Sequence, residues 1–457
     1  MHSASPIVLP SIDGVVVVAP KWLVPVSSSP IRDGYLVIGG SKILHVGAEL
    51  PPQFASIRKI NLPCAAIAPG LINAHCHLEF SDLMQPIPAG PTFPDWIKRL
   101  IAFRTAQSES APHLMDNRKA AIEAGLRESY SHGVRWIVDM TTQPWDPVWC
   151  QTAFSTTSFA NNVFPTVVQP CIEMLDVTES RAEQSNAFLQ KHLHAPTTLG
   201  AMRCGLAPHA SYTASTEMTR RMSELSRSES RLISMHLAES EDEMAWMRSH
   251  SGPFKAFLQA ILQPSYLPKL GSIDDRLESL RLGWRSLVAH ANFLSDSQVR
   301  FIAENALNMA IVHCPRTHQF FGHQHPDGPS YPLAERLALG AVHLIGTDSR
   351  ASNPDLNLWA EAQTIRATHP EVSSQRILRM LTCDAAAFLN VPAEDYGALR
   401  VGSPAALTAI DLTDCIEACS NELTPDRLYD HLLNRNTLTL PLEQAIAGAI
   451  QTVTNAS

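Results

Sequence analysis

The sequence predicts an α/β protein with a (β/α)8 TIM-like barrel and a small composite β-sandwich domain. In the middle of the chain, apolar strand-like runs alternate with segments of helical period, a pattern typical of a parallel sheet covered by helices. Both ends of the chain show short strands and turns instead. We therefore expect residues 67–390 to form the barrel, and residues 1–66 and 391–457 to form the β-sandwich and a tail.

The two ends carry hairpin and strand patterns. Residues 34–40 form an apolar run that ends in a Gly-Gly turn, and residues 42–46 look like its hairpin partner. Residues 397–402 and 405–411 also resemble strands, and the tail from Asn421 on looks partly helical. We expect these segments to join in one domain.

Eight strand candidates define the predicted barrel. They are residues 66–72, 134–140, 164–172, 202–206, 232–237, 286–289, 309–313 and 342–346. Helical patterns between them include residues 115–129, 215–227 and 297–304. Residues 240–285 are long for a connection and contain helical pattern, which makes them a candidate lid over the barrel mouth.

Composition excludes several classes of protein. Of 457 residues, 45% are hydrophobic and 17% are charged, as in ordinary globular proteins. Acidic residues outnumber basic ones by 44 to 35, which argues against nucleic acid as a partner. Nine scattered cysteines without a CxxC pair favour a reducing compartment. With neither a signal-peptide pattern nor a membrane-length apolar run, we expect a soluble cytoplasmic protein that acts on a small molecule.

Five side chains suited to metal binding or catalysis stand at the ends of strand candidates. His75 and His77 are alternate residues on the first barrel strand, so both rings face one side. His236, His290 and Asp348 end the fifth, sixth and eighth candidates. Because barrel active sites are built at the carboxyl ends of the strands, the five residues indicate one metal site rather than unrelated polar positions.

Glu239 lies three residues after His236. A carboxylate at this place is a metal ligand, an acid in the first turn of the next helix, or a proton shuttle beside a metal-bound water. The neighbouring histidines favour the shuttle.

Further side chains are candidates for substrate binding. His209 follows the fourth strand candidate, and His318 lies in a loop with four histidines between residues 313 and 325. A polar substrate loop is favoured over a second metal site there. Glu79, Trp96 and Arg104 are candidates for lining the mouth, with a core position as the alternative for Trp96.

The same segments resemble the amidohydrolase superfamily over nearly the whole chain. Residues 69–77, PGLINAHCH, look like its signature, and residues 236–239, His290 and residues 346–349 match its later motifs in order. Residues 208–213 resemble its aminohydrolase and chlorohydrolase branch.

The resemblance implies a role for each of these side chains. His75, His77, His236 and Asp348 would bind one divalent ion, zinc or alternatively iron(II). Glu239 would be the proton shuttle, His290 would orient the metal-bound hydroxide, and Asp348 would also take its proton. Two-metal relatives carry a carboxylated lysine at the end of the fourth strand, where this chain has residues 208–209, so a one-metal site is expected. Superfamily members are often oligomers, which makes a homo-oligomer an option.

The reaction that this implies is deamination of a cyclic amidine. The ion lowers the pKa of bound water from about 15.7 towards roughly 7, hydroxide attacks the ring carbon, and Glu239 protonates the neighbouring nitrogen so that ammonia leaves. Residues 77–81 and 93–104 are similar to deaminases of aminodeoxyfutalosine, S-adenosylhomocysteine and methylthioadenosine. His318 replaces an asparagine of many relatives, which leaves the exact substrate open.

Two alternatives remain at this stage. The first is a hydrolase that removes chloride or an alkylamine from a triazine ring; Glu239 counts against dechlorination because chloride leaves without a proton. The second is an inactive barrel that serves as a scaffold. The complete set of expected ligands argues against this alternative.

Overall fold

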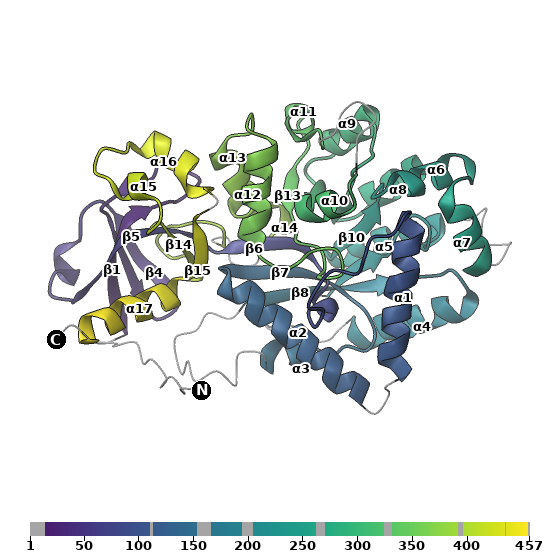
Figure 1. Ribbon diagram of the computed structural model, residues 1–457, viewed down its shortest axis with the longest axis horizontal. Helices are drawn as coiled ribbons and strands as arrows, with labels where there is room; N and C mark the ends of the chain where they lie inside the picture. The colour runs from purple at the N-terminus through teal and green to yellow at the C-terminus, as the bar shows by residue number, and fades with distance from the viewer. Residues whose placement is uncertain are drawn as a thin grey trace.

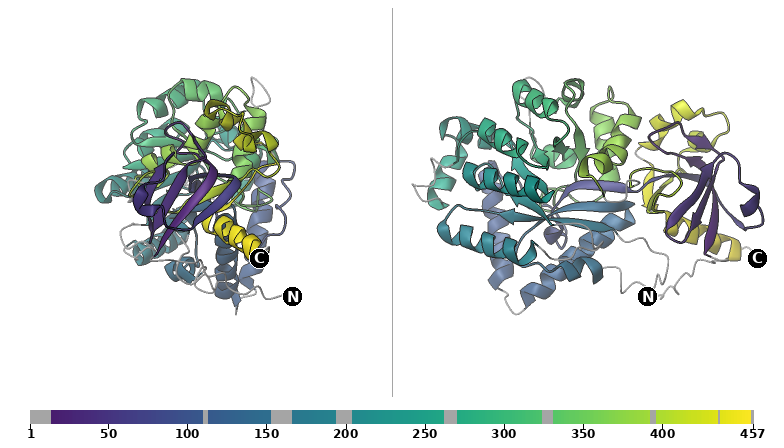
Figure 2. Two further views of the ribbon diagram at one scale, coloured as in Figure 1. Left: turned by 90° about the vertical axis from the view of Figure 1, so that its left-hand side faces the viewer. Right: turned by 180° about the vertical axis from the view of Figure 1, so that it is seen from behind.

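A computed structural model describes residues 14–109, 113–152, 166–193, 204–261, 270–323, 331–391, 396–434 and 436–455. The chain forms a large barrel domain and a smaller β domain beside it (Figure 1). Figure 2 shows from behind that the N-terminal strands and the C-terminal helices build the small domain together. This arrangement confirms the predicted barrel with a composite β domain. Among the described residues, no helix combines the length and apolarity needed to cross a bilayer.

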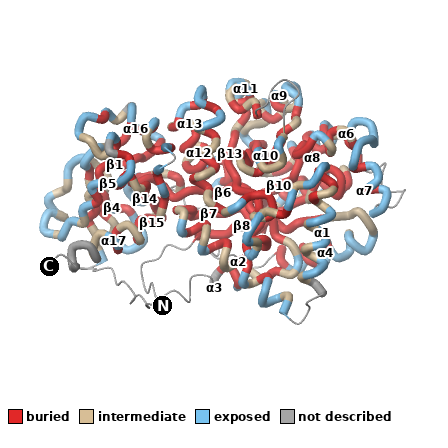
Figure 3. Tube along the Cα trace, in the orientation of Figure 1, coloured by how far each residue is buried: buried red, intermediate tan, exposed pale blue. Residues whose placement is uncertain are grey.

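The barrel sheet has eight strands that follow one another in sequence order. They are β6 (Leu71–Cys76), β7 (Val134–Thr141), β8 (Val167–Met174), β9 (Gly205–Pro208), β10 (Leu232–Leu237), β11 (Arg285–His290), β12 (Met309–His313) and β13 (His343–Ile345). Every registered pair is parallel. All their residues are buried except the half-buried Arg285, and Figure 3 shows the barrel strands mostly in the colour of buried residues. Strands of a parallel sheet are buried on both faces, because helices cover the outside and side chains fill the inside.

Helices follow every barrel strand along the chain. They are α1 (Phe93–Glu109), α2 (Leu114–Ser131), α3 (Pro147–Thr152), α4 (Glu179–His192), α5 (Thr216–Glu229), α6 (Glu241–Ser249), α7 (Pro253–Ile261), α8 (Ile273–Arg281), α9 (Asp296–Glu304), α10 (Pro315–Phe320), α11 (Leu333–Ala338), α12 (Leu358–Thr368), α13 (Ser374–Met380) and α14 (Cys383–Leu389). Serine side chains cap several of them, including Ser215 before α5 and Ser295 before α9. The candidate lid contains α6, α7 and α8, and part of it lies outside the described residues; its movement stays a prediction.

The first and last barrel strands meet at a short seam. Cys76 and Asp348 form an isolated parallel bridge, and the Asp348 backbone N–H donates to the His75 carbonyl at 3.0 Å. Beside it, the Asn73 amide donates to the Thr347 hydroxyl at 2.8 Å and accepts from the Thr347 backbone N–H at 3.1 Å. The residues that close the barrel are therefore the residues at the ends of β6 and β13.

Gly346 makes this close approach of the two strands possible. A Cβ atom at position 346 would lie 2.7 Å from the His75 Cβ and 2.8 Å from the His75 carbonyl oxygen. No side chain fits into that space, so the glycine sets the distance between the seam strands.

The small domain contains a seven-stranded sheet from both ends of the chain. Its order is β15 (Leu438–Pro441), β14 (Leu407–Asp411), β5 (Lys59–Pro69), β1 (Val15–Leu23), β3 (Tyr35–Gly39) and β4 (Lys42–Gly47), with β2 (Ile31–Arg32) pairing to β1. The predicted hairpin is β3 with β4. Three helices complete the domain, α15 (Ile416–Cys419), α16 (Pro425–Leu432) and α17 (Leu442–Asn455).

A buried ion pair joins the two domains. Arg135 of β7 donates to both carboxylate oxygens of Glu443 in α17, at 2.9 and 2.6 Å, and to the Leu407 carbonyl of β14 at 2.8 Å. The Tyr130 hydroxyl donates to Glu443 at 2.7 Å. The guanidinium thus reaches from the barrel into the C-terminal part of the small domain.

Two predicted strands differ in the structure. Residues 66–72 belong to two strands of different sheets, because β5 ends at Pro69 and β6 begins at Leu71. Residues 397–402 form turns rather than a strand, and Gly397 and Gly402 have φ of +79° and +92° there, which a regular strand does not permit. The starts of the predicted strands 164–172 and 202–206 lie outside the described residues.

Candidate active site

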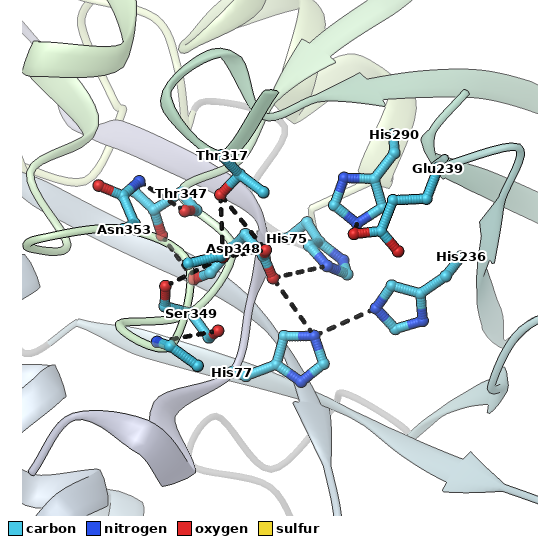
Figure 4. Close-up of polar contacts among 12 residues, drawn as sticks. His75, His77, His236, Glu239, His290, Thr317, Thr347, Asp348, Ser349 and Asn353 are labelled. Carbon is cyan, nitrogen blue, oxygen red and sulfur yellow. Dashed lines mark hydrogen bonds and ion pairs between the residues drawn. The ribbon is translucent and has the colours of Figure 1, made fainter. Parts of the chain in front are cut away.

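The five strand-end residues of the predicted metal site meet at one end of the barrel (Figure 4). The Nε2 atoms of His77 and His236 are 3.1 Å apart, and Oδ1 of Asp348 is 3.6 Å from Nε2 of both His75 and His77. The rings of His290 and His236 stack with centroids 5.6 Å apart. All five side chains are buried.

These donors fit a divalent cation. Two ligands at about 2.1 Å from a tetrahedral zinc ion lie roughly 3.4 Å apart, close to the spacing found here. Both ring nitrogens of His75 and Nδ1 of His77 have no hydrogen-bond partner in the structure although they are buried. Burial lowers the pKa of His77, and lowers that of His236 to about 3. The imidazoles of His77 and His236 are therefore neutral and offer lone pairs rather than positive charge.

Neighbouring groups orient the candidate ligands. Nδ1 of His236 lies 2.8 Å from the His209 carbonyl oxygen, so it carries the ring proton and turns Nε2 towards the other donors. Oδ2 of Asp348 accepts from the Ser352 hydroxyl at 2.6 Å and the Thr317 hydroxyl at 3.3 Å. Oδ1 is left to face the histidines. Ser352 and Thr317 carry no sequence signal of their own, because they reach Asp348 from a turn and from α10, which are separated along the chain.

The backbone at two of these positions has an unusual conformation. His290 has φ of +66° and Asp348 has φ of +58°, in the left-handed region that non-glycine residues seldom adopt. Such conformations concentrate at functional sites, where the surrounding contacts enforce them.

Glu239 lies beside the candidate metal donors. Its Oε1 is 3.7 Å from Nε2 of His290, and the side chain is buried. Burial raises the pKa of Glu239 well above its usual value, and the charges of Asp348 and Glu243 raise it further. The side chain is therefore suited to hold a proton at neutral pH and to release it to a bound molecule.

Glu243 fixes the turn that carries Glu239. Its carboxylate accepts the backbone N–H of Ala238 at 3.1 Å, that of Glu239 at 2.8 Å and the Ser211 hydroxyl at 2.5 Å. Sequence reasoning missed this residue, because an acid in the first turn of a helix after the cap Ser240 looks like ordinary helix capping.

Two of the predicted substrate-binding residues bind each other. Glu79 and Arg104 form an ion pair, and Arg118 also pairs with Glu79. The Thr142 hydroxyl donates to Glu79 at 2.5 Å. Nearby, Asp139 accepts the backbone N–H of Leu78 at 2.8 Å, and burial raises its pKa to about 6.

The remaining predicted substrate contacts occupy different surroundings. Trp96 is buried, donates its ring N–H to the Ala351 carbonyl at 3.3 Å and packs against Phe321 with centroids 5.0 Å apart. His318 is also buried and its ring lies against His313 and His323, at centroid distances of 6.0 and 5.5 Å. The part of the predicted histidine loop that includes His325 lies outside the described residues.

His209 lies next to the donors, and so does a carboxylate that the sequence reasoning missed. Glu173 ends β8 within the barrel, and one of its oxygens, a ring nitrogen of His209 and a ring nitrogen of His236 lie within 4.8 Å of one another. An acid inside an apolar strand was the available signal, and the strand prediction stopped one residue before it.

Comparison with known proteins agrees with this architecture. The model of the amidohydrolase family matches residues 66–439, and the chain belongs to that family. It is accordingly a hydrolase that acts on carbon–nitrogen bonds. A 5-methylthioadenosine/S-adenosylhomocysteine deaminase of Pyrococcus furiosus is 24% identical over 432 residues, which are 88% of this chain and 85% of the relative.

Solved structures share the fold. Helicobacter pylori aminofutalosine deaminase in complex with methylthio-coformycin superposes with a TM-score of 0.73 at 18% identity, covering 93% of this chain and 97% of that one. Atrazine chlorohydrolase from Arthrobacter aurescens in complex with zinc gives a TM-score of 0.66 at 19% identity, covering 95% and 99% of the two chains.

Proposed function

We propose that this protein is a zinc-dependent aminohydrolase that deaminates an adenosine-like nucleoside. The observation that carries the proposal is the buried set of three imidazoles and one carboxylate with Glu239 beside it. His75, His77, His236 and Asp348 would hold the ion. Bound zinc supplies a water of lowered pKa, so that a nucleophile is available at neutral pH.

The side chains around the ion divide the proton transfers between them. Glu239 donates its proton to the ring nitrogen beside the carbon under attack, which prepares the amino group to leave as ammonia. His290 orients the attacking water, since its ring faces the same space as Glu239. Asp348 accepts a proton of the water through the oxygen that faces the histidines and passes it to the amino group, which leaves as ammonia.

The names of the relatives support a nucleoside substrate. The Pyrococcus relative is named for methylthioadenosine and S-adenosylhomocysteine, and the Helicobacter structure for aminofutalosine. These compounds share an adenine ring with an amino group on an amidine carbon. We propose that one of them is the substrate, and that the protein is an enzyme of the cytoplasm that acts on a small molecule.

Ammonia release from zinc-loaded protein tests the proposal. The panel contains adenosine, methylthioadenosine, S-adenosylhomocysteine and aminodeoxyfutalosine, and at least one is expected to yield one ammonia for each inosine-type product. If no member yields ammonia, the nucleoside proposal is wrong. Elemental analysis of the same protein checks the ion: about one zinc per chain is expected, and protein that takes up none would indicate an inactive scaffold.

A triazine hydrolase is the second candidate, because the fold is also that of atrazine chlorohydrolase. Chloride or alkylamine release from a chlorotriazine panel distinguishes it from the deaminase. Glu239 favours the deaminase over a dechlorinating enzyme, since a leaving amine needs a proton and chloride does not. Release of an alkylamine needs the same proton, so the panel alone decides that case.

A further inference from the structure

Glu173 is a buried acid on the wall of the candidate active site. It lies at the carboxyl end of β8, where barrel strands present functional side chains, and only 6% of it is exposed. Its carboxylate is within 4.8 Å of ring nitrogens of both His209 and His236. It therefore borders the space into which the candidate metal donors point.

The carboxylate of Glu173 lacks a protein hydrogen-bond donor. None of the hydrogen bonds found in the described parts of the chain involves it. The other buried acids near the site, Glu79, Glu243 and Asp139, each accept at least one hydrogen bond. Burial raises the pKa of Glu173, and its oxygens are open to a hydrogen bond with a bound molecule.

One cationic side chain acts on Glu173. Arg104 lies close enough for its charge to favour the carboxylate form of Glu173, and its guanidinium also pairs with Glu79, which Arg118 shares. Burial lowers the pKa of His209 to about 3, so that ring is neutral. Nδ1 of His209 lies 2.5 Å from the Thr213 hydroxyl, which leaves Nε2 as the ring atom free to face the site. The wall thus offers a hydrogen-bond acceptor and a neutral imidazole side by side.

We propose that Glu173 determines substrate specificity by accepting a hydrogen bond from a sugar hydroxyl of the substrate. The inference rests on the proposed nucleoside deaminase function and adds the group that selects the sugar. A pocket built to bond a hydroxyl rejects an analogue that lacks it, because the buried acceptor is then left unpaired. An alkyl substituent, as on a triazine, would leave Glu173 in that state.

The test compares adenosine with 9-propyladenine, which has the same reacting ring but an alkyl chain in place of ribose. Wild-type zinc-loaded protein is expected to prefer adenosine in kcat/KM. Glu173→Leu should lower kcat/KM for adenosine by roughly 10- to 100-fold, the usual effect of losing a hydrogen bond to a charged group, and change that for 9-propyladenine less than about threefold. Glu173→Gln keeps an acceptor oxygen and should retain more of the preference.

Binding of purine riboside by calorimetry gives a readout that does not depend on ammonia release. Glu173→Leu should weaken it by a similar factor while zinc content stays at the wild-type level. Glu183→Leu is the matched control, since it removes an exposed glutamate from α4, the helix that follows β8. It should change neither binding nor preference.

Two outcomes would overturn the inference. An unchanged preference in both Glu173 variants, whether kcat/KM stays the same or falls equally for both substrates, would mean that Glu173 acts only in folding or metal binding. Should Glu173→Leu fail to fold, the ratio measured for Glu173→Gln decides. Wild-type protein that neither deaminates nor binds any nucleoside would overturn the proposed function itself, and the inference with it.

Discussion

Individual side chains at the site differ in what they do with protons. Burial lowers the pKa of His77, so its ring presents a lone pair, whereas burial and nearby negative charge raise the pKa of Glu239 well above its usual value. A site with neutral donors for a cation and one protonated acid has separate groups for activating water and for protonating a leaving amine.

Replacing Glu239 with glutamine should remove the acid without removing the ion. Zinc content is expected to stay near one per chain, while kcat falls by roughly 10²- to 10⁴-fold, the usual contribution of a general acid. Elemental analysis and an ammonia assay on the same preparation measure both. Activity within a few-fold of wild type would show that Glu239 is not the proton donor.

The polar residues at strand ends could be predicted from the sequence, but the side chains that orient them through hydrogen bonds could not. The positions of His236, His290 and Asp348 follow from apolar runs that end in a polar residue, and the structure brings them together with His75 and His77. Thr317 and Ser352 orient Asp348 across the fold, and no local pattern marks such long-range partners.

Individual elements control how far apart the ligands lie. β6 and β13 approach closely because Gly346 has no Cβ, and α12 ties α10 to the loop that contains Asn353. Glu361 of α12 accepts the Arg316 backbone N–H at 2.9 Å and the Asn353 amide at 2.6 Å. Asn353 in turn donates to the Thr347 carbonyl at 2.8 Å.

Gly346→Ala should disturb the candidate metal site by pushing apart the two strands that meet at the seam, β6 and β13. The added methyl group would lie 2.7 Å from the His75 Cβ, so the strands must separate, at a cost of about 1–3 kcal/mol in unfolding free energy. A lower Tm and at least about tenfold weaker zinc binding are expected. Gly448→Ala is the control, because that exposed glycine of α17 has open space and should gain up to about 1 kcal/mol.

Glu361 should make stability depend on pH. Burial raises its pKa from 4.5 to about 8, in spite of Arg316 at 3.8 Å. Between these values the folded protein binds more protons at this group than the unfolded chain does, so its contribution to stability falls as pH rises. Glu361→Gln should flatten the decline in unfolding free energy between pH 5 and 8, as measured by urea denaturation. A variant with the wild-type slope would contradict the assignment.

Across the whole molecule, the barrel and the small domain are joined by buried polar contacts as well as by the chain. Arg135 is fully buried and spans from β7 to α17 and β14. The sequence predicted both domains from the change in periodicity, but it placed one strand across the boundary. Pro69 and Leu71 are both apolar, and the switch between sheets at Gly70 depends on contacts with Arg135 and Ala406 that are distant in sequence.

Removing one partner of the inter-domain ion pair between Arg135 and Glu443 should lower the stability of the protein. Glu443→Ala leaves the Arg135 guanidinium buried without its carboxylate and is expected to lower the unfolding free energy by about 3–5 kcal/mol. The double change Arg135→Met with Glu443→Leu should cost less than the single one, because no charge is left unpaired. Thermal unfolding of the three proteins measures the difference. Equal Tm values for wild type and Glu443→Ala would contradict it.

If the proposed ion is bound, the seam of the barrel also determines when during synthesis the protein can acquire it. His75 and His77 emerge from the ribosome early, whereas Asp348 follows only after the last barrel strand has been made. A nascent chain therefore presents an incomplete donor set, and full coordination becomes available only when β13 docks against β6. In the proposed enzyme, metal binding and barrel closure would then be one event, in which the ion holds the first and last barrel strands together.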